Sequence, residues 1–344
     1  KYGIRNTELS WFRSYLSDRS QIVINNGEKS KKCFLNIGVP QGTVLGPTLF
    51  LLFVNNLSNC IRNAHINIYA DDVVMYASHS SISELRNILQ SNLHDVYNWY
   101  KSNRLTLSTQ KCSTMVINCN VNERIENFDI YLGVDKLEQV TTMKYLGVTI
   151  DDKLKWNAHL PNISRKVNIN NSRLRKSRKI LPQGLRVKYH NSLSVPSIDY
   201  AATVWGTFSN SIQNSITRLE HMAARAISGN YDYINTRGSF LMSDLGLTNF
   251  IDRNHYQKAV LMYKSIHGLV PDHICNNILF SYEVSNRNLR SFDNMNLYIT
   301  KPHCEIFRNS LQYSGGMIWN FLPLHIKEAT SVNNFKHLYK SVYF

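Results

Sequence analysis

Residues 66–76 read Ile-Asn-Ile-Tyr-Ala-Asp-Asp-Val-Val-Met-Tyr, so two adjacent carboxylates, Asp71 and Asp72, interrupt two short apolar runs. Ile, Val and Tyr favour extended strands, and the polar break between the runs predicts a turn. We therefore expect a β-hairpin with Asp71 and Asp72 at its tip. Paired acids there suggest a bound divalent metal ion, and the alternative is a solvated turn in which aspartate is simply a favoured residue.

The composition indicates a basic, globular chain. Its 344 residues carry a formal charge of +15, and the hydrophobic fraction of 43% excludes a largely disordered protein. Such a charge is typical of a protein that binds a polyanion, and nucleic acid is the first partner we expect. Residues 44–57 form the longest apolar stretch, which is too short to span a membrane, so we expect a buried helix there and no membrane partner.

Cysteine and histidine offer little chemistry. The six cysteines are dispersed, with no Cys-x-x-Cys pair, which favours a reducing intracellular compartment. His273, Cys275, His303 and Cys304 match no standard zinc spacing, so we expect scattered residues there and no zinc site. The chain opens at Lys1 in what reads as the middle of a helix, and we expect it to be a fragment of a longer protein.

Three regions follow from changes in pattern. Residues 1–150 mix short β-like runs with helices, which indicates an α+β layer with an antiparallel sheet. Residues 151–230 are helical in pattern, with Gly229 as a C-cap, and residues 231–344 form an α-rich extension that carries a helix at 250–266. The β-like runs are 21–24, 33–37, 66–76, 113–117, 130–132 and 144–150, and the first three helices are 9–16, 47–57 and 82–99.

A basic segment lies within the second region. Between residues 161 and 190 there are nine Lys and Arg residues and no acidic residue. A run of charge is usually a solvated helix face, but cations without any acidic neighbour favour a surface that follows a phosphate backbone. The densest part of this segment contains Arg173, Arg175, Lys176, Arg178 and Lys179.

A loop rich in glycine and proline precedes the hairpin by about thirty residues. Residues 38–47 read Gly-Val-Pro-Gln-Gly-Thr-Val-Leu-Gly-Pro and lead directly into an apolar helix. Glycine allows a backbone to approach a ligand closely, and Gln41 offers an amide donor and acceptor beside it. By itself the loop could be no more than a strained helix entry.

Taken together, these motifs resemble a known family. The order of residues 38–47, 69–72, 99–107 with Lys111, and 144–148 with Trp156 and His159 is similar to that in reverse transcriptases of non-LTR retrotransposons, of the LINE-like or jockey-like type. The resemblance extends over nearly the whole chain, through Trp205-Gly206 to Trp319–Pro323. It implies an incomplete polymerase palm at 1–150, a helical thumb at 151–230 and a C-terminal extension at 231–344.

The resemblance also implies a role for each matching residue. Asp71 and Asp72 match the catalytic aspartates that bind two Mg²⁺ ions, and Lys111 matches a lysine that acts on the pyrophosphate. Residues at the template and incoming nucleotide would be Pro40, Gln41, Gly42, Tyr69 and Ala70. Tyr145, Leu146 and Gly147 would grip the primer, and the basic helical segment would contact the nucleic-acid backbone. The partners implied are an RNA template, a DNA primer and deoxynucleoside triphosphates, in a nuclear and cytoplasmic ribonucleoprotein.

One element of the family pattern is missing. The first palm motif, with the aspartate that completes the metal site, should lie upstream of Gly3, and no residue here replaces it. We therefore expect the 344-residue chain alone not to polymerise. Two alternatives stay open at this point: a degraded or repurposed copy that only binds nucleic acid, and a group II intron maturase. The sequence does not indicate an oligomeric state.

Overall fold

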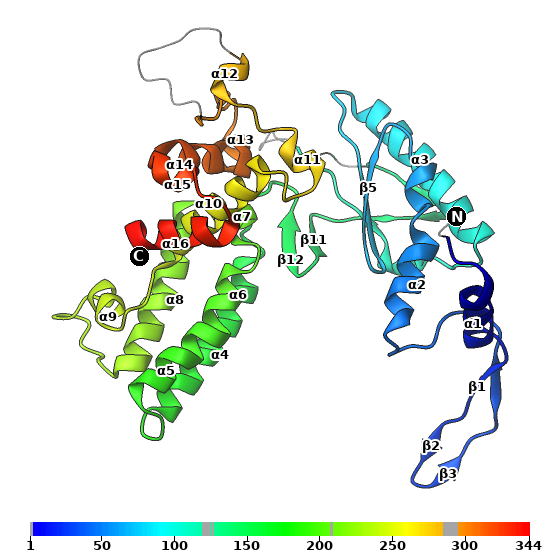
Figure 1. Ribbon diagram of the computed structural model, residues 1–344, viewed down its shortest axis with the longest axis horizontal. Helices are drawn as coiled ribbons and strands as arrows, with labels where there is room; N and C mark the ends of the chain where they lie inside the picture. The colour runs from blue at the N-terminus through cyan, green and yellow to red at the C-terminus, as the bar shows by residue number, and fades with distance from the viewer. Residues whose placement is uncertain (1–2, 119–124, 126, 207–208, 285–294) are drawn as a thin grey trace. The chain divides into compact units, whose positions relative to one another are not determined.

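The computed structural model describes residues 3–118, 125, 127–206, 209–284 and 295–344, and its ribbon is drawn in Figure 1. These residues form two compact units. Unit 1 contains the described residues of 1–114 and 127–139, and unit 2 contains those of 115–125 and 140–344. Both units combine helices with short strands or hairpins, so the α+β class is confirmed.

Unit 1 is built from short strands around one long helix. Its elements are α1 (Asn6–Leu16), β1 (Arg19–Gln21), β2 (Ile24–Asn25), β3 (Glu28–Lys29), β4 (Cys33–Leu35), α2 (Leu45–Val54), η1 (Leu57–Cys60), β5 (His65–Tyr69), β6 (Asp72–Tyr76), α3 (Ile82–Ser102), η2 (Thr109–Lys111), β7 (Ser113–Thr114), β8 (Tyr131–Leu132), β9 (Asp135–Lys136) and β10 (Glu138–Gln139). The predicted single antiparallel sheet is wrong in detail, because the strands pair as separate two-stranded ladders and the β7–β10 ladder is parallel.

The helix α3 organises the core of unit 1. Ser81 caps its N-terminus by accepting a hydrogen bond from the Glu84 amide, and its buried face packs Val96 and Trp99 against Val54 and Leu57. The amide side chain of Gln90 bonds both the N–H and the C=O of Tyr131, at 2.8 and 2.9 Å, which ties the β8–β9 hairpin to α3.

The prediction that residues 44–57 form a buried helix is only partly right. The helix α2 is present, but Leu51 and Phe53 are 50% and 45% exposed. An all-apolar helix normally has neighbours on every side. Val54 is buried in the core of unit 1 and Phe50 packs against it, while Phe53 contacts the ring of Trp99 at its edge.

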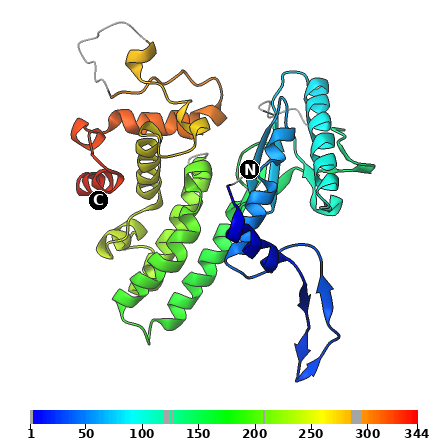
Figure 2. The same ribbon diagram turned by 45° about the vertical axis from the view of Figure 1, so that its right-hand side comes forward.

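Unit 2 is mainly helical. Its elements are β11 (Thr142–Tyr145), β12 (Val148–Asp151), α4 (Leu160–Ser177), α5 (Gln183–Tyr189), η3 (His190–Ser194), α6 (Val195–Asp199), α7 (Ala202–Trp205), α8 (Asn210–Ser228), α9 (Gly238–Asp244), α10 (Phe250–Ile266), α11 (Asp272–Cys275), α12 (Ser281–Val284), α13 (Glu305–Asn309), η4 (Leu311–Gly315), α14 (Gly316–Phe321), α15 (Leu324–Lys327) and α16 (Val332–Tyr343). Helices α4 and α8 pack side by side (Figure 2).

Two predictions for the helices of unit 2 are confirmed: the C-cap at Gly229 and the helix at 250–266. The predicted C-cap Gly229 ends α8 with φ +81°, a conformation that favours glycine, and Asn249 caps α10 by accepting from the Asp252 amide. One core joins α4, α8 and the β12 hairpin through Val148, Trp156 and Trp205. A second core, around Trp319 and Phe335, joins α10 to the C-terminal helices.

A buried ionic network links three helices of unit 2. The guanidinium of Arg253 on α10 makes bonds of 2.9 to 3.1 Å with both carboxylate oxygens of Asp199, and its Nη1 lies 2.9 Å from Glu220 Oε1 on α8. Glu220 is 1% exposed, and its second oxygen accepts the Phe250 amide at 3.1 Å. Burial raises the pKa of Glu220, and the adjacent Arg253 opposes that effect.

His190 lies in the same interior and makes unit 2 sensitive to acid. The residue is 2% exposed, and burial, with a smaller contribution from Arg253, lowers its pKa to about 4. In the unfolded chain the histidine has a pKa near 6.5. Between about pH 6.5 and pH 4 the unfolded chain therefore binds more protons than the folded one, and the folded state loses stability as the pH falls through this range. This group alone should lower the free energy of unfolding by about 2 kcal/mol between pH 7 and pH 5.

Urea denaturation of the 344-residue chain at the two pH values measures this effect. His190→Phe should remove that part of the pH dependence, whereas His325→Phe, at an exposed position, should leave it in place. Equal pH dependence in the wild-type chain and in His190→Phe would contradict the prediction.

None of the helices in the described part of the chain has both the length and the apolar character needed to cross a bilayer.

Candidate active site

The predicted hairpin around the paired aspartates is confirmed. Strands β5 and β6 pair in antiparallel register, with Tyr69 opposite Asp72, so Ala70 and Asp71 form a two-residue turn. Ala70 has φ +52°, which is an uncommon conformation for a residue other than glycine. Ile66, Ile68 and Val73 anchor the inward face of the hairpin to the core of unit 1.

The two carboxylates lie at the exposed tip of this anchored hairpin. Asp71 and Asp72 are both exposed, as are Tyr69 and Ala70 beside them. Oxygen ligands of this kind suit Mg²⁺, which is commonly held by one or two carboxylates together with water and substrate phosphates. The described residues contain no cluster of three or more His, Cys, Asp or Glu side chains suited to a metal. The two carboxylates thus offer the type of oxygen ligand that Mg²⁺ prefers, and metal binding by Asp71 and Asp72 stays a prediction.

The loop at 38–47 is held in shape by Thr43. Its hydroxyl donates to the Pro40 carbonyl at 2.8 Å, and it accepts from Tyr15 at 3.0 Å and from the Gly46 amide at 3.2 Å. A side chain at Gly46 would lie 3.2 Å from the Pro40 oxygen, which explains glycine there. Pro40 is half-buried, whereas Gln41 and Gly42 are exposed and face solvent on unit 1.

Lys111 is also exposed on unit 1, at the end of η2. The sequence predicts that this lysine acts on the pyrophosphate, and that role stays a prediction. The same holds for the template and nucleotide roles of Pro40, Gln41 and Gly42.

The predicted primer-grip residues form a second tight hairpin, in unit 2. Leu146 and Gly147 have φ +44° and +84° between the paired residues Tyr145 and Val148, as the two central residues of a type I′ turn require. The hydroxyl of Tyr200 donates to the Leu146 carbonyl at 2.6 Å. Its ring lies so close to Gly147 that an added Cβ would be 3.3 Å away. Sequence reasoning missed Tyr200 as the partner of this turn.

The basic segment is an exposed surface on α4 and the residues that follow it. Arg173, Arg175, Lys176, Arg178 and Lys179 are all exposed. Arg178 also donates to the Gly229 carbonyl at 3.1 Å, which joins this segment to the C-terminal end of α8. One of the nine predicted surface cations does not belong to this surface. Arg186 is only 7% exposed and lies on the inner face of α5, so the prediction is wrong for that residue.

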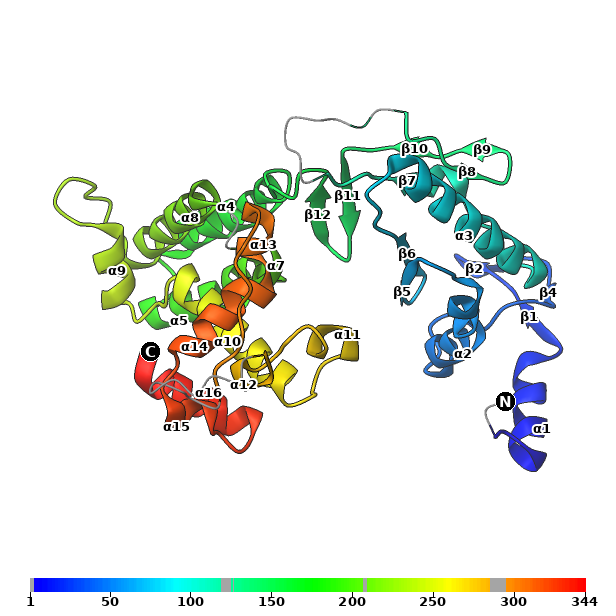
Figure 3. The ribbon, with the colours of Figure 1, turned by 90° about the horizontal axis from the view of Figure 1, so that it is seen from above.

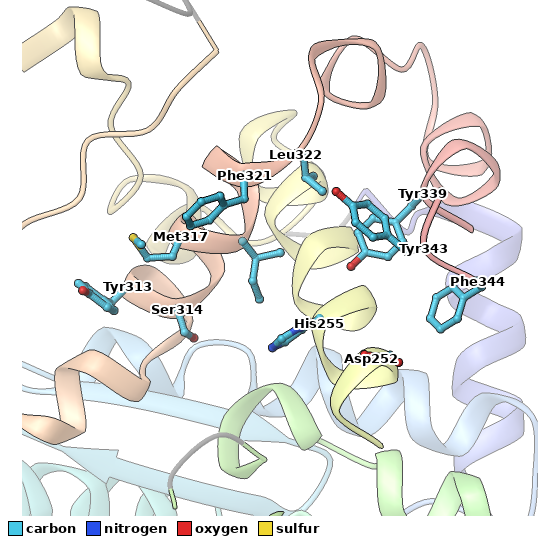
Figure 4. Close-up of a pocket in the computed structure, with 11 residues that line it drawn as sticks. Asp252, His255, Tyr313, Ser314, Met317, Phe321, Leu322, Tyr339, Tyr343 and Phe344 are labelled. Atoms are coloured by element: carbon cyan, nitrogen blue, oxygen red, sulfur yellow. The ribbon is translucent and has the colours of Figure 1, made fainter. Parts of the chain in front are cut away.

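A cavity of about 520 Å³ lies among the C-terminal helices of unit 2. Figure 4 shows Asp252 and His255 of α10, Met317 and Phe321 of α14, and Tyr339 of α16 around it. At its edge the fully buried Lys258, with a pKa lowered by burial to about 8, donates to Ser314 Oγ at 2.6 Å. The lining is mainly apolar, and no sequence motif indicated this cavity.

Comparison with known proteins agrees with these motifs. Residues 1–150 match the model of the family described as reverse transcriptase (RNA-dependent DNA polymerase). This part of the chain is similar to reverse transcriptases. The match covers both the loop at 38–47 and the hairpin at 65–76, and it ends at β12.

Relatives among characterised proteins extend this likeness beyond the reverse transcriptase domain. The chain is 28% identical over 235 residues to the RNA-directed DNA polymerase from mobile element jockey of Drosophila melanogaster, covering 65% of this chain and 25% of that protein. It is 32% identical over 251 residues to the probable RNA-directed DNA polymerase from transposon BS of the same organism, covering 68% of this chain and 27% of that protein. A Pol polyprotein from the type-1 retrotransposable element R1 2 of Nasonia vitripennis is 24% identical over 179 residues, 49% of this chain and 43% of that protein.

The predicted resemblance to reverse transcriptases of non-LTR retrotransposons is therefore confirmed. The chain spans about a quarter of the length of the jockey and BS relatives that it matches.

Proposed function

We propose that the protein to which this chain belongs is an RNA-directed DNA polymerase of a retrotransposon, which adds deoxynucleotides to a primer 3′-hydroxyl on an RNA template. The observation that carries the proposal is the anchored hairpin with Asp71 and Asp72 at its exposed tip, inside the region that matches the reverse transcriptase family. The names of the jockey and BS relatives agree with it.

In this proposal unit 1 supplies part of the palm. Asp71 and Asp72 hold the metal, which when bound activates the primer hydroxyl and offsets charge on the leaving pyrophosphate. Ala70 leaves room for the primer terminus, and Gln41 presents its amide to a base or a sugar. Lys111 donates a proton to the pyrophosphate or offsets its charge.

Unit 2 supplies the primer grip and the thumb. The type I′ turn at Leu146 and Gly147 presents backbone without a bulky side chain, and Tyr200 fixes the position of that backbone. The cations at the end of α4 then follow the phosphates of the bound hybrid. Residues 231–344 support the thumb, since Arg253 of α10 pairs with residues of α6 and α8.

Copying of an RNA template by the whole protein tests this function. Deoxynucleotides should be added to an annealed DNA primer in the presence of Mg²⁺, and no product should form without template. A protein that binds the hybrid but adds no nucleotide would favour the alternative of an element copy that only binds nucleic acid.

The role of the basic surface predicts a change in salt dependence. Replacing Arg175 and Lys179 by Gln should reduce the slope of log affinity against log salt concentration by about 1 to 2, because each phosphate contact releases a counterion. Fluorescence anisotropy with a labelled RNA–DNA hybrid measures the slope. The exposed Lys301→Gln serves as the matched control, and a slope unchanged by the double substitution would exclude phosphate contacts there.

A further inference from the structure

The loop at residues 229–237 joins α8 to α9 (Figure 3). The side chain of one arginine, Arg225 of α8, holds its backbone in place. Arg225 is 5% exposed, and its guanidinium donates to three backbone carbonyls of the loop. The acceptors are Asn230 at 3.4 Å, Asp232 at 3.1 Å and Thr236 at 2.7 Å.

Side chains of the loop add further bonds to this arrangement. The Asp232 carboxylate accepts the amides of Ile234 and Asn235 at 3.0 and 2.9 Å, and Asn230 donates to the Thr236 hydroxyl at 3.2 Å. The backbone at the tip is therefore fixed before any ligand arrives, which lowers the entropy lost on binding.

The rigid loop presents aromatic and apolar side chains to solvent. Tyr233 is 68% exposed and Ile234 is 94% exposed. The ring of Tyr233 stacks on the Arg225 guanidinium, whose central carbon lies 4.2 Å from the ring centroid. One face of the ring is thus covered by a buried cation, and the ring keeps its orientation while most of its surface stays open.

Positive charge surrounds the base of the loop. Arg178, at the end of α4, donates to the Gly229 carbonyl, where the loop begins. An added Cβ at Gly229 would fall within 3 Å of the Arg178 side chain, so the two segments are in close contact. The neighbours of Arg178 include the exposed cations Arg175, Lys176 and Lys179. The loop itself adds Arg237, and its one acid, Asp232, is engaged by three loop N–H donors.

We propose that this loop is a stacking site for an unpaired base of single-stranded nucleic acid, with Tyr233 as the platform and the cations at the end of α4 as contacts for the adjoining phosphates. A single strand fits because its bases are free to stack on an aromatic ring while its backbone lies on positive charge. The charge around the loop favours this occupant over an apolar protein surface. The inference rests on the proposed nucleic-acid-binding function and adds to it a second, strand-specific contact.

Three variants of the 344-residue chain test the proposal by fluorescence anisotropy. The probes are an unstructured labelled RNA of about 15 nucleotides, the DNA of the same sequence and the corresponding RNA–DNA hybrid. Tyr233→Ala should weaken the binding of single strands about tenfold, and should leave hybrid affinity within about twofold. Tyr233→Phe, which keeps the ring, should bind like the wild-type chain. Tyr298→Ala, at another exposed tyrosine, controls for general loss of aromatic surface.

The outcomes separate the stacking site from the wider function. If Tyr233→Ala binds single strands as tightly as Tyr233→Phe, while Arg175→Gln with Lys179→Gln still weakens binding, the stacking site is wrong and the basic surface stands. If neither set of substitutions changes affinity, both are wrong. A preference for RNA or DNA among the single strands identifies which strand the loop receives.

Discussion

Replacing Asp71 by Asn in the whole protein is expected to lower the rate of RNA-templated primer extension by about 1,000-fold or more, because a metal held by charged oxygens stabilises the transition state by several kcal/mol. Asparagine keeps the size of the side chain and its ability to occupy a turn, but it carries no negative charge. Asp71 is exposed at the tip of the β5–β6 hairpin, so the substitution should change the free energy of unfolding of the protein by no more than about 0.5 kcal/mol.

The matched control is Asp135→Asn. Asp135 is also an exposed aspartate next to a hairpin turn of unit 1, and it pairs with Leu132 in the β8–β9 ladder. It should extend primers at the wild-type rate. Single-turnover extension of a labelled primer measures both variants at saturating nucleotide. Comparable loss in the two variants, or full activity in Asp71→Asn, would show that the hairpin tip does not hold the catalytic metal.

The elements that sequence alone predicted best are those whose signals are local. The alternating apolar residues on either side of Asp71 specify a hairpin, and Gly229 supplies the positive φ that ends α8. The helix at 250–266 begins after a capping asparagine and was predicted at its observed bounds. In each case the residues that specify the turn or the end of the helix lie within a few positions of it in the sequence.

Tertiary contacts decided what could not be predicted. Arg186 belongs by sequence to a basic surface, but its place on the inner face of α5 buries it. Tyr200 lies more than fifty residues from the turn that it holds, and Arg253 joins residues of two helices that precede it in the chain. The strands form separate two-stranded ladders. That pairing depends on which segments meet in space, and the hydrophobic periodicity of a sequence contains no information about it.

The two carboxylates at the tip of the β5–β6 hairpin bear on the choice between an enzyme and a protein that only binds nucleic acid. Two acids at the tip of one hairpin can hold a metal that phosphates complete, so they indicate the chemistry of the parent protein. In our proposals, nucleic-acid binding depends instead on the α4 cations and the loop at 229–237, which lie in unit 2. The two properties can therefore be lost independently, and assays of extension and of affinity should be made on the same variants.

Arg253→Met is expected to lower the free energy of unfolding of unit 2 by about 3–5 kcal/mol, because it leaves buried charge without a partner. Methionine fills much of the volume of the arginine stem, so the loss comes from the unpaired carboxylates of Asp199 and Glu220. Glu220 suffers most, since it is 1% exposed and burial already raises its pKa.

Urea denaturation followed by helical circular dichroism measures the loss in the 344-residue chain, with Arg218→Met as the control at an exposed position on the same helix as Glu220. The control should stay within about 0.5 kcal/mol of the wild-type chain. Adding Glu220→Gln and Asp199→Asn to Arg253→Met should recover part of the stability, because neutral amides are cheaper to bury than unpaired carboxylates. A triple variant less stable than Arg253→Met alone would mean that the loss comes from packing around the arginine stem and not from unpaired charge.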